Sequence, residues 1–177
     1  DIPSGSPYIP SVISDNLSGS MMLMQHLLGL GHRKIAYLSG VSPAARLTIS
    51  DRLAGYVLAL SEAKIPITPQ FIYTDISEDD RSAPISSPHS LRAILSTLLH
   101  MGVTAVAAEH DGIAYDILLC CRELGIDVPG QLSVCGFDNS EWATALSNST
   151  PSMRITTIAQ NQAQIGRKVA ELLWEGL

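Results

Sequence analysis

Polar side chains that could grip a small molecule follow three apolar runs of the sequence. They are Arg46 and Arg52 after KIAYLSG, Glu109, His110 and Asp111 at the end of VTAVAAEHD, and Asp138 and Asn139 at the end of LSVCGFDN. A carboxylate accepts hydrogen bonds from two neighbouring hydroxyl or N–H groups, and a guanidinium donates a planar fork. With an imidazole beside them, these groups predict recognition of a polyhydroxylated or heterocyclic ligand.

The same residues also have structural interpretations. Asp138 is a good N-cap for a short helix over 141–146, and spacing by itself favours that role. Spacing likewise favours a cap at Asp111 and a solvated or locally paired Arg52. His110 fits an ordinary loop position. On the residue types alone, ligand binding and structural roles both stay open for this group.

Patterns that carry catalysis or metal binding are weak. The sequence has no phosphate loop, no Gly-x-Gly-x-x-Gly and no Gly-x-Ser-x-Gly. Residues 61–64 match Ser-x-x-Lys, but they fall inside a predicted helix, which favours a chance match. The five histidines lack metal-ligand spacing, and the three cysteines include no Cys-x-x-Cys pair. We therefore expect no metal, no cofactor and no enzymatic activity.

Composition narrows the class of protein. Apolar residues make up 46% of the 177 residues and charged residues 16%, which is typical of a packed core. The net charge of -6 argues against nucleic-acid binding by this segment itself, because phosphate contacts need clustered lysine and arginine. DNA contact would need a segment outside the chain. No stretch is apolar enough to span a bilayer, and an odd number of cysteines predicts reduced, buried thiols in a cytoplasmic protein.

The elements that must position the polar residues alternate along the chain. Strands are predicted at 11–14, 34–40, 71–75, 103–110, 131–138 and 155–159. Helices fall between them, with starts at Ser50 or Asp51 and at Asp111, stops at Gly31 and Gly125, and a last helix lined by Ile165, Val169, Leu172 and Leu173. This alternation predicts βαβ units in a parallel sheet covered on both faces. Ligands of such sheets bind beyond the carboxyl ends of the strands.

Several short motifs occur in a definite order. They are SDNLSG (14–19), HLLGLGHRKIA (26–36), RLAGY (52–56), ELGIDVP (123–129), LSVCGFDN (132–139) and TTIAQ (156–160), followed by Gly166 and Ala170. In this order and spacing they resemble the effector-binding domain of the LacI/GalR family of bacterial transcription repressors. The resemblance covers nearly all of residues 11–177.

The resemblance implies an α/β fold, a parallel-sheet, three-layer α/β/α lobe of the type I periplasmic-binding-protein-like class. Residues 1–10 would be a linker, 11–150 the second lobe, and 151–177 a crossover strand and helix that resemble part of the first lobe. A helix-turn-helix domain and most of the first lobe are expected outside this chain. The last helix would then pack on the lobe, on a second copy, or by exchange between chains.

The resemblance also implies ligand-binding residues. Asp138 would accept hydrogen bonds from the effector, Arg52 would donate to it, Gln160 would reach it from near the hinge, and Gly136 would let the backbone approach it. His110 stands where many members carry asparagine. An imidazole donates and accepts with different geometry, and only donates when protonated. We therefore expect an effector that need not be a sugar, and binding that depends on pH.

The expected function is effector sensing by a transcription regulator. A sugar or nucleoside-like molecule would bind between lobes of a homodimeric protein and shift the balance of lobe orientations. Two alternatives stay open: a solute-binding protein of a transporter, which needs a secretion signal, and a small doubly wound enzyme. The GFD and LGH motifs favour the regulator over both.

Overall fold

The computed structural model describes residues 11–40, 46–76, 79, 90–145 and 154–175, without the side chains of 46–49 and 144–145. Its centre is one five-stranded sheet in the order β2-β1-β3-β4-β5, in which every neighbouring pair is parallel. The strands are β1 (Ile35–Gly40), β2 (Ile72–Ile76), β3 (Ala105–Ala108), β4 (Ser133–Asp138) and β5 (Thr156–Ala159). The predicted parallel sheet is confirmed.

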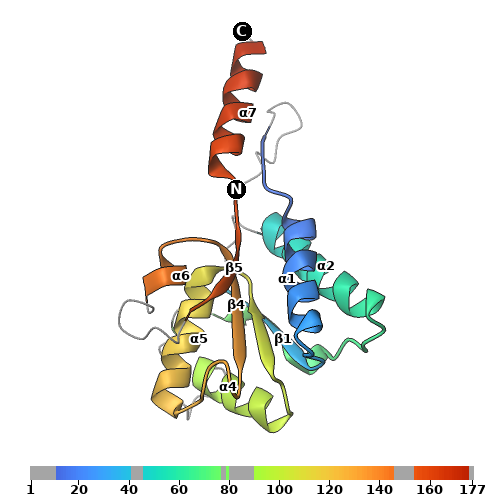
Figure 1. The fold of residues 1–177 in the computed structure, drawn as a ribbon, viewed down its shortest axis with the longest axis vertical. Helices are drawn as coiled ribbons and strands as arrows, with labels where there is room; N and C mark the ends of the chain where they lie inside the picture. The colour runs from blue at the N-terminus through green and yellow to red at the C-terminus, as the bar shows by residue number, and fades with distance from the viewer. Residues whose placement is uncertain (1–10, 41–45, 77–78, 80–89, 146–153, 176–177) are drawn as a thin grey trace.

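Helices cover both faces of the sheet (Figure 1). On one face lie α1 (Asn16–Gly29) and α2 (Arg46–Glu62), and on the other α4 (Leu91–His100) and α5 (Asp111–Leu124). Side chains of a strand alternate between faces, so Ile35 and Tyr37 join the α1–α2 core while Ala36 and Leu38 join the α4–α5 core. Burial on both sides explains the unbroken apolar run of β1 and confirms the three-layer prediction.

Shorter elements complete the fold. They are η2 (Pro69–Phe71), α6 (Trp142–Ala145) and α7 (Gln162–Glu175). The chain passes from β1 outward to β2 and then returns across β1 to form β3, so the strand order reverses between β1 and β3. Such a reversal opens a crevice at the carboxyl ends of the two strands, because the helices that follow them lie on opposite faces.

The helix ends agree with the sequence in part. Asp15 caps α1 by accepting a hydrogen bond from the Ser18 N–H at 2.9 Å, and α5 ends at Gly125 in the left-handed region at φ 68°. The predicted start of α2 at Ser50 or Asp51 is wrong, because the helix begins at Arg46. Both side chains are exposed and tolerate the helix interior.

The predicted strand at 11–14 is also wrong. These residues pair with no strand, and the apolar Val12 and Ile13 line a cavity instead of a sheet face. An apolar run becomes a strand only where a neighbouring strand offers backbone partners, and none of the described strands pairs with this segment. The predicted linker at 1–10 lies outside the described residues.

The three cysteines lie in the core as free thiols, as predicted. Burial raises the pKa of Cys120 to about 11 and the pKa of Cys121 and Cys135 to about 12. All three are therefore protonated and unreactive at neutral pH. Among the described helices, none has the length and apolar character needed to cross a membrane.

Helix α7 stands clear of the sheet and of the other helices (Figure 1), and none of its residues is buried. Val169, Leu173 and Trp174 are 39%, 63% and 84% exposed. The expectation that α7 packs on the lobe of its own chain is therefore wrong. Packing on a second copy, or exchange between chains, stays a prediction.

Close approach of α1 and α2 depends on Gly55. A Cβ at this position would lie 2.6 Å from both the Leu17 carbonyl oxygen and the Ser20 Cβ. We expect Gly55→Ala to lower the free energy of unfolding by about 1–3 kcal/mol through overpacking, measured by urea denaturation. Gly29→Ala is the control, since nothing lies within 4 Å of its added Cβ. Equal stability of the two variants would contradict the packing argument.

The exposed face of α7 predicts self-association of the 177-residue chain by itself. Large apolar patches rarely stay in contact with water. Light scattering should show a dimer or larger species, and the double substitution Leu173→Glu with Trp174→Glu should return it to a monomer. A strictly monomeric unaltered chain with a mobile α7 would show that this face needs no partner.

Candidate functional site

The buried guanidinium of Arg52 lies at the carboxyl edge of the sheet, where the strand order reverses. Its side chain comes from α2 and is 7% exposed. The Nε group donates to Asn16 Oδ1 at 2.9 Å, Nη1 donates to the Glu109 carbonyl oxygen at 2.7 Å, and Nη2 donates to Asp138 Oδ1 at 2.9 Å. The prediction that the arginine and the aspartate meet at one rim is confirmed.

Phe137 supports the guanidinium from below. The Arg52 Cζ lies 3.8 Å from the centroid of this ring, within the range of a cation–π contact. The ring itself is held against α1, because a Cβ on Gly19 would lie 2.7 Å from the Phe137 Cζ. Phe137, the aromatic residue of the GFD motif, therefore sets how far the Arg52 guanidinium lies from the sheet.

Asp138 ends β4 in an unusual backbone conformation. Its φ is 102°, and Asn139 follows at φ 52°, a region that costs energy for residues with a side chain. The Oδ1 atom accepts from both Arg52 and Gln160, the latter at 2.5 Å, and 33% of the side chain stays exposed. The cap hypothesis for Asp138 is wrong, because the carboxylate points to the guanidinium and α6 begins only at Trp142.

Gln160 joins the two segments that run toward α7 and the N-terminus. Its Nε2 donates to Asp138 Oδ1, and its Oε1 accepts from the Ser14 hydroxyl at 2.9 Å. One amide therefore links residue 14, which precedes α1, to the end of β4. The sequence placed Gln160 near a hinge, and the structure brings it into the same cluster as Arg52 and Asp138.

His110 is the N-cap of α5. Its Nδ1 accepts from the N–H groups of Gly112 at 3.0 Å and Ile113 at 3.3 Å, which requires an unprotonated nitrogen. The ring is partly exposed and directly follows Glu109, whose carbonyl oxygen binds Arg52. The interpretation of His110 as an ordinary loop residue is wrong, and so is the prediction that Asp111 caps this helix.

Asp111 has a structural role of a different kind. Its buried carboxylate accepts from the Ser140 N–H at 2.6 Å, the Ser140 hydroxyl at 3.1 Å and the Thr157 hydroxyl at 2.6 Å. It ties α5 to the turn after β4 and to β5. Gly136 gives room for this carboxylate, because an added Cβ would overlap Asp111 Oδ1. The expectation that Gly136 makes room for a ligand is therefore wrong.

Two residues of the cluster were missed as contacts of Arg52. Asn16 is only 1% exposed, and Phe137 is buried beneath the guanidinium. A buried asparagine needs a hydrogen-bond partner, but the position of Asn16 in the sequence of α1 does not reveal that this partner lies on α2.

Nearby, the hydroxyl of Tyr37 is buried without a partner among the described residues. Burial first, and then the Glu109 carboxylate, raise the pKa of Tyr37.

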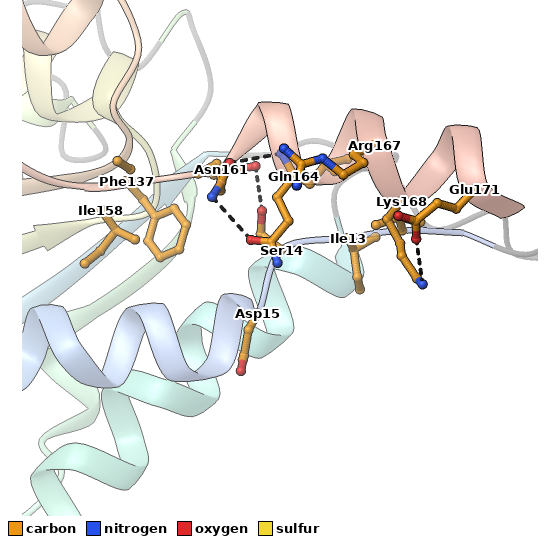
Figure 2. Close-up of a pocket in the computed structure, with 14 residues that line it drawn as sticks. Ile13, Ser14, Asp15, Phe137, Ile158, Asn161, Gln164, Arg167, Lys168 and Glu171 are labelled. Atoms are coloured by element: carbon orange, nitrogen blue, oxygen red, sulfur yellow. Dashed lines mark hydrogen bonds and ion pairs between the residues drawn. The ribbon is translucent and has the colours of Figure 1, made fainter.

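A cavity of about 510 Å³ lies beside this cluster, between residues 12–15 and the first turns of α7 (Figure 2). Phe137 and Ile158 close one end, and Lys168 and Glu171 lie at the other. Gln160 lines the cavity and also binds Asp138, so the cavity adjoins the Arg52–Asp138 ion pair.

Within the described part of the chain, no group of three or more His, Cys, Asp or Glu side chains could hold a metal ion.

Comparison with known proteins identifies the family. A family model described as periplasmic binding protein-like domain matches residues 24–177. The chain is 29% identical over 164 residues to the arabinose metabolism transcriptional repressor of Geobacillus stearothermophilus, covering 93% of this chain and 42% of that protein. It is 30% identical over 164 residues to the HTH-type transcriptional repressor PurR of Vibrio parahaemolyticus, covering 93% of this chain and 45% of that protein.

Solved structures show the same architecture. A LacI family transcriptional regulator from Enterococcus faecium with bound ribose superimposes with a TM-score of 0.74 at 25% identity, covering 97% of this chain and 58% of that chain. The chain spans less than half the length of the two curated relatives. The matched region and the three-layer fold confirm the resemblance drawn from the motifs. The chain belongs to the periplasmic binding protein-like domain family, in the form found in the effector-binding domains of LacI-family transcription regulators.

Proposed function

We propose that this chain is the effector-sensing part of a transcription regulator, and that its effector contacts Arg52, His110, Asp138 and Gln160. The observation that carries the proposal is the convergence on Asp138 Oδ1 of the Arg52 guanidinium at 2.9 Å and the Gln160 amide at 2.5 Å. An aspartate held by two donors, yet one-third exposed, can accept from a ligand without moving.

The chemistry favours a small uncharged molecule rich in hydroxyl or N–H groups. Asp138 accepts hydrogen bonds, and Arg52 keeps N–H groups that its three described partners do not use. A sugar or a nucleoside-like molecule presents donors and acceptors on neighbouring atoms, as such a pair requires. The related regulators named for arabinose metabolism, or solved with bound ribose, support the sugar class.

The proposed sensing mechanism needs parts outside this chain. Residues 11–150 would form the second lobe, and 151–177 would enter a first lobe that covers the exposed face of α7 and completes the cleft. Effector binding at Asp138 would then bias the lobe orientation, and a helix-turn-helix segment would read that bias as a change in DNA affinity. We place this regulator in the cytoplasm, as a homodimer without enzymatic activity, because the curated relatives compared above are transcriptional repressors.

A thermal-shift screen of the intact protein tests the proposal. Arabinose, ribose, cellobiose and inosine are the probes, and at least one should raise the melting temperature, because a ligand that binds only the folded state stabilises it. Asp138→Asn should abolish that shift. Glu62→Gln, which changes an exposed acid at the end of α2, is the matched control and should keep it. A shift that survives Asp138→Asn would place the ligand elsewhere.

A further inference from the structure

The capping role of His110 has a consequence for what the site can recognise. Because Nδ1 accepts from two N–H groups of α5, the neutral ring must carry its proton on Nε2. We propose that His110 is a fixed hydrogen-bond donor of the effector site, and that it selects ligands with an acceptor next to the donor that Asp138 binds. This inference rests on the proposed function and adds a specificity-determining role for one residue.

The ring cannot easily turn to present its other nitrogen. A Cβ on Gly112 would lie 2.9 Å from His110 Cε1 and 3.0 Å from Nδ1, so the ring packs directly over the bare Cα of this glycine. The Trp142 ring borders the same position, with its Cδ1 4.0 Å from that Cβ, and contacts the Tyr115 ring in a tilted arrangement at a centroid distance of 5.0 Å. Helix capping and packing therefore hold one ring orientation.

Asp138 and His110 then require opposite hydrogen-bonding groups on the ligand. Asp138 is a carboxylate and only accepts, whereas His110 Nε2 only donates. Asp138 ends β4, and His110 follows the end of the neighbouring parallel strand β3 by two residues. The Glu109 carbonyl beside His110 and the Asp138 carboxylate both accept hydrogen bonds from the Arg52 guanidinium. The matching ligand edge carries a donor and an acceptor together, as in a pair of hydroxyls or an N–H beside a carbonyl.

Three substitutions separate the donor from the cap. His110→Asn keeps an acceptor for the α5 N-terminus and retains N–H donors. His110→Asp keeps the cap acceptor but loses the donor, and His110→Ala loses both. In the intact protein, His110→Asn should bind arabinose, ribose, cellobiose or inosine within a fewfold of the unaltered protein. The other two variants should bind roughly tenfold or more weakly. Only His110→Ala should also melt at a lower temperature without ligand.

The outcomes distinguish this inference from the proposed function. Tight binding by His110→Ala, or by His110→Asp, with binding lost in Asp138→Asn, would overturn the donor role and leave the effector site standing. If all of these variants bind the probe as tightly as the unaltered protein, both the donor role and the proposed effector site are overturned. Nitrogen-15 NMR of the ligand-free intact protein gives an independent test, since two-bond couplings report the tautomer. A proton on Nδ1 of His110 would overturn the inference whether or not any probe binds, and a proton on Nε2 would support it.

Discussion

The buried guanidinium of Arg52 is the constraint on which the rest of the site depends. A charge removed from water is tolerated only where hydrogen-bond partners and an opposite charge surround it. Its partners here come from α1, from the end of β3 and from the end of β4, with the Phe137 ring beneath. Satisfying one side chain therefore sets the relative positions of two helices and two strands at the carboxyl edge of the sheet.

That arrangement also explains how ligand binding at Asp138 would affect the two segments that carry Ser14 and Gln160. The same Oδ1 atom accepts from Arg52 and from Gln160, and Gln160 in turn accepts from Ser14. Ser14 and Gln160 lie on the two segments that leave the sheet domain toward α7 and the N-terminus. Under the proposed function, a ligand that competes for this oxygen changes the hydrogen bonding of both segments together, which is what a hinge between lobes requires.

The three adjacent residues that follow β3 have separate structural roles. Glu109 gives its backbone carbonyl to Arg52, His110 caps α5, and Asp111 binds Ser140 and Thr157 across the α5 face of the sheet. These three residues thereby connect the sheet to the helices on both of its faces. Gly112 and Gly136 are needed because the His110 ring and the Asp111 carboxylate occupy the space of their missing Cβ atoms.

The sequence by itself determined the class of fold and the edge of the sheet at which the candidate site residues gather. Strands that are apolar on both faces and alternate with helices predict a parallel sheet covered by helices on both sides. The polar residues that follow KIAYLS, AVAA and VCGF must then gather at the carboxyl edge of that sheet. Tertiary structure decided the roles within that edge. Whether Asp138 caps a helix or binds a guanidinium depends on where α2 packs, and that is set by contacts such as Gly55 against α1. Whether residues 11–14 form a strand depends on a neighbour being present, and whether α7 is buried depends on a partner surface. Local patterns report the preferences of a segment, whereas the outcome at these positions is set by groups far away in the chain.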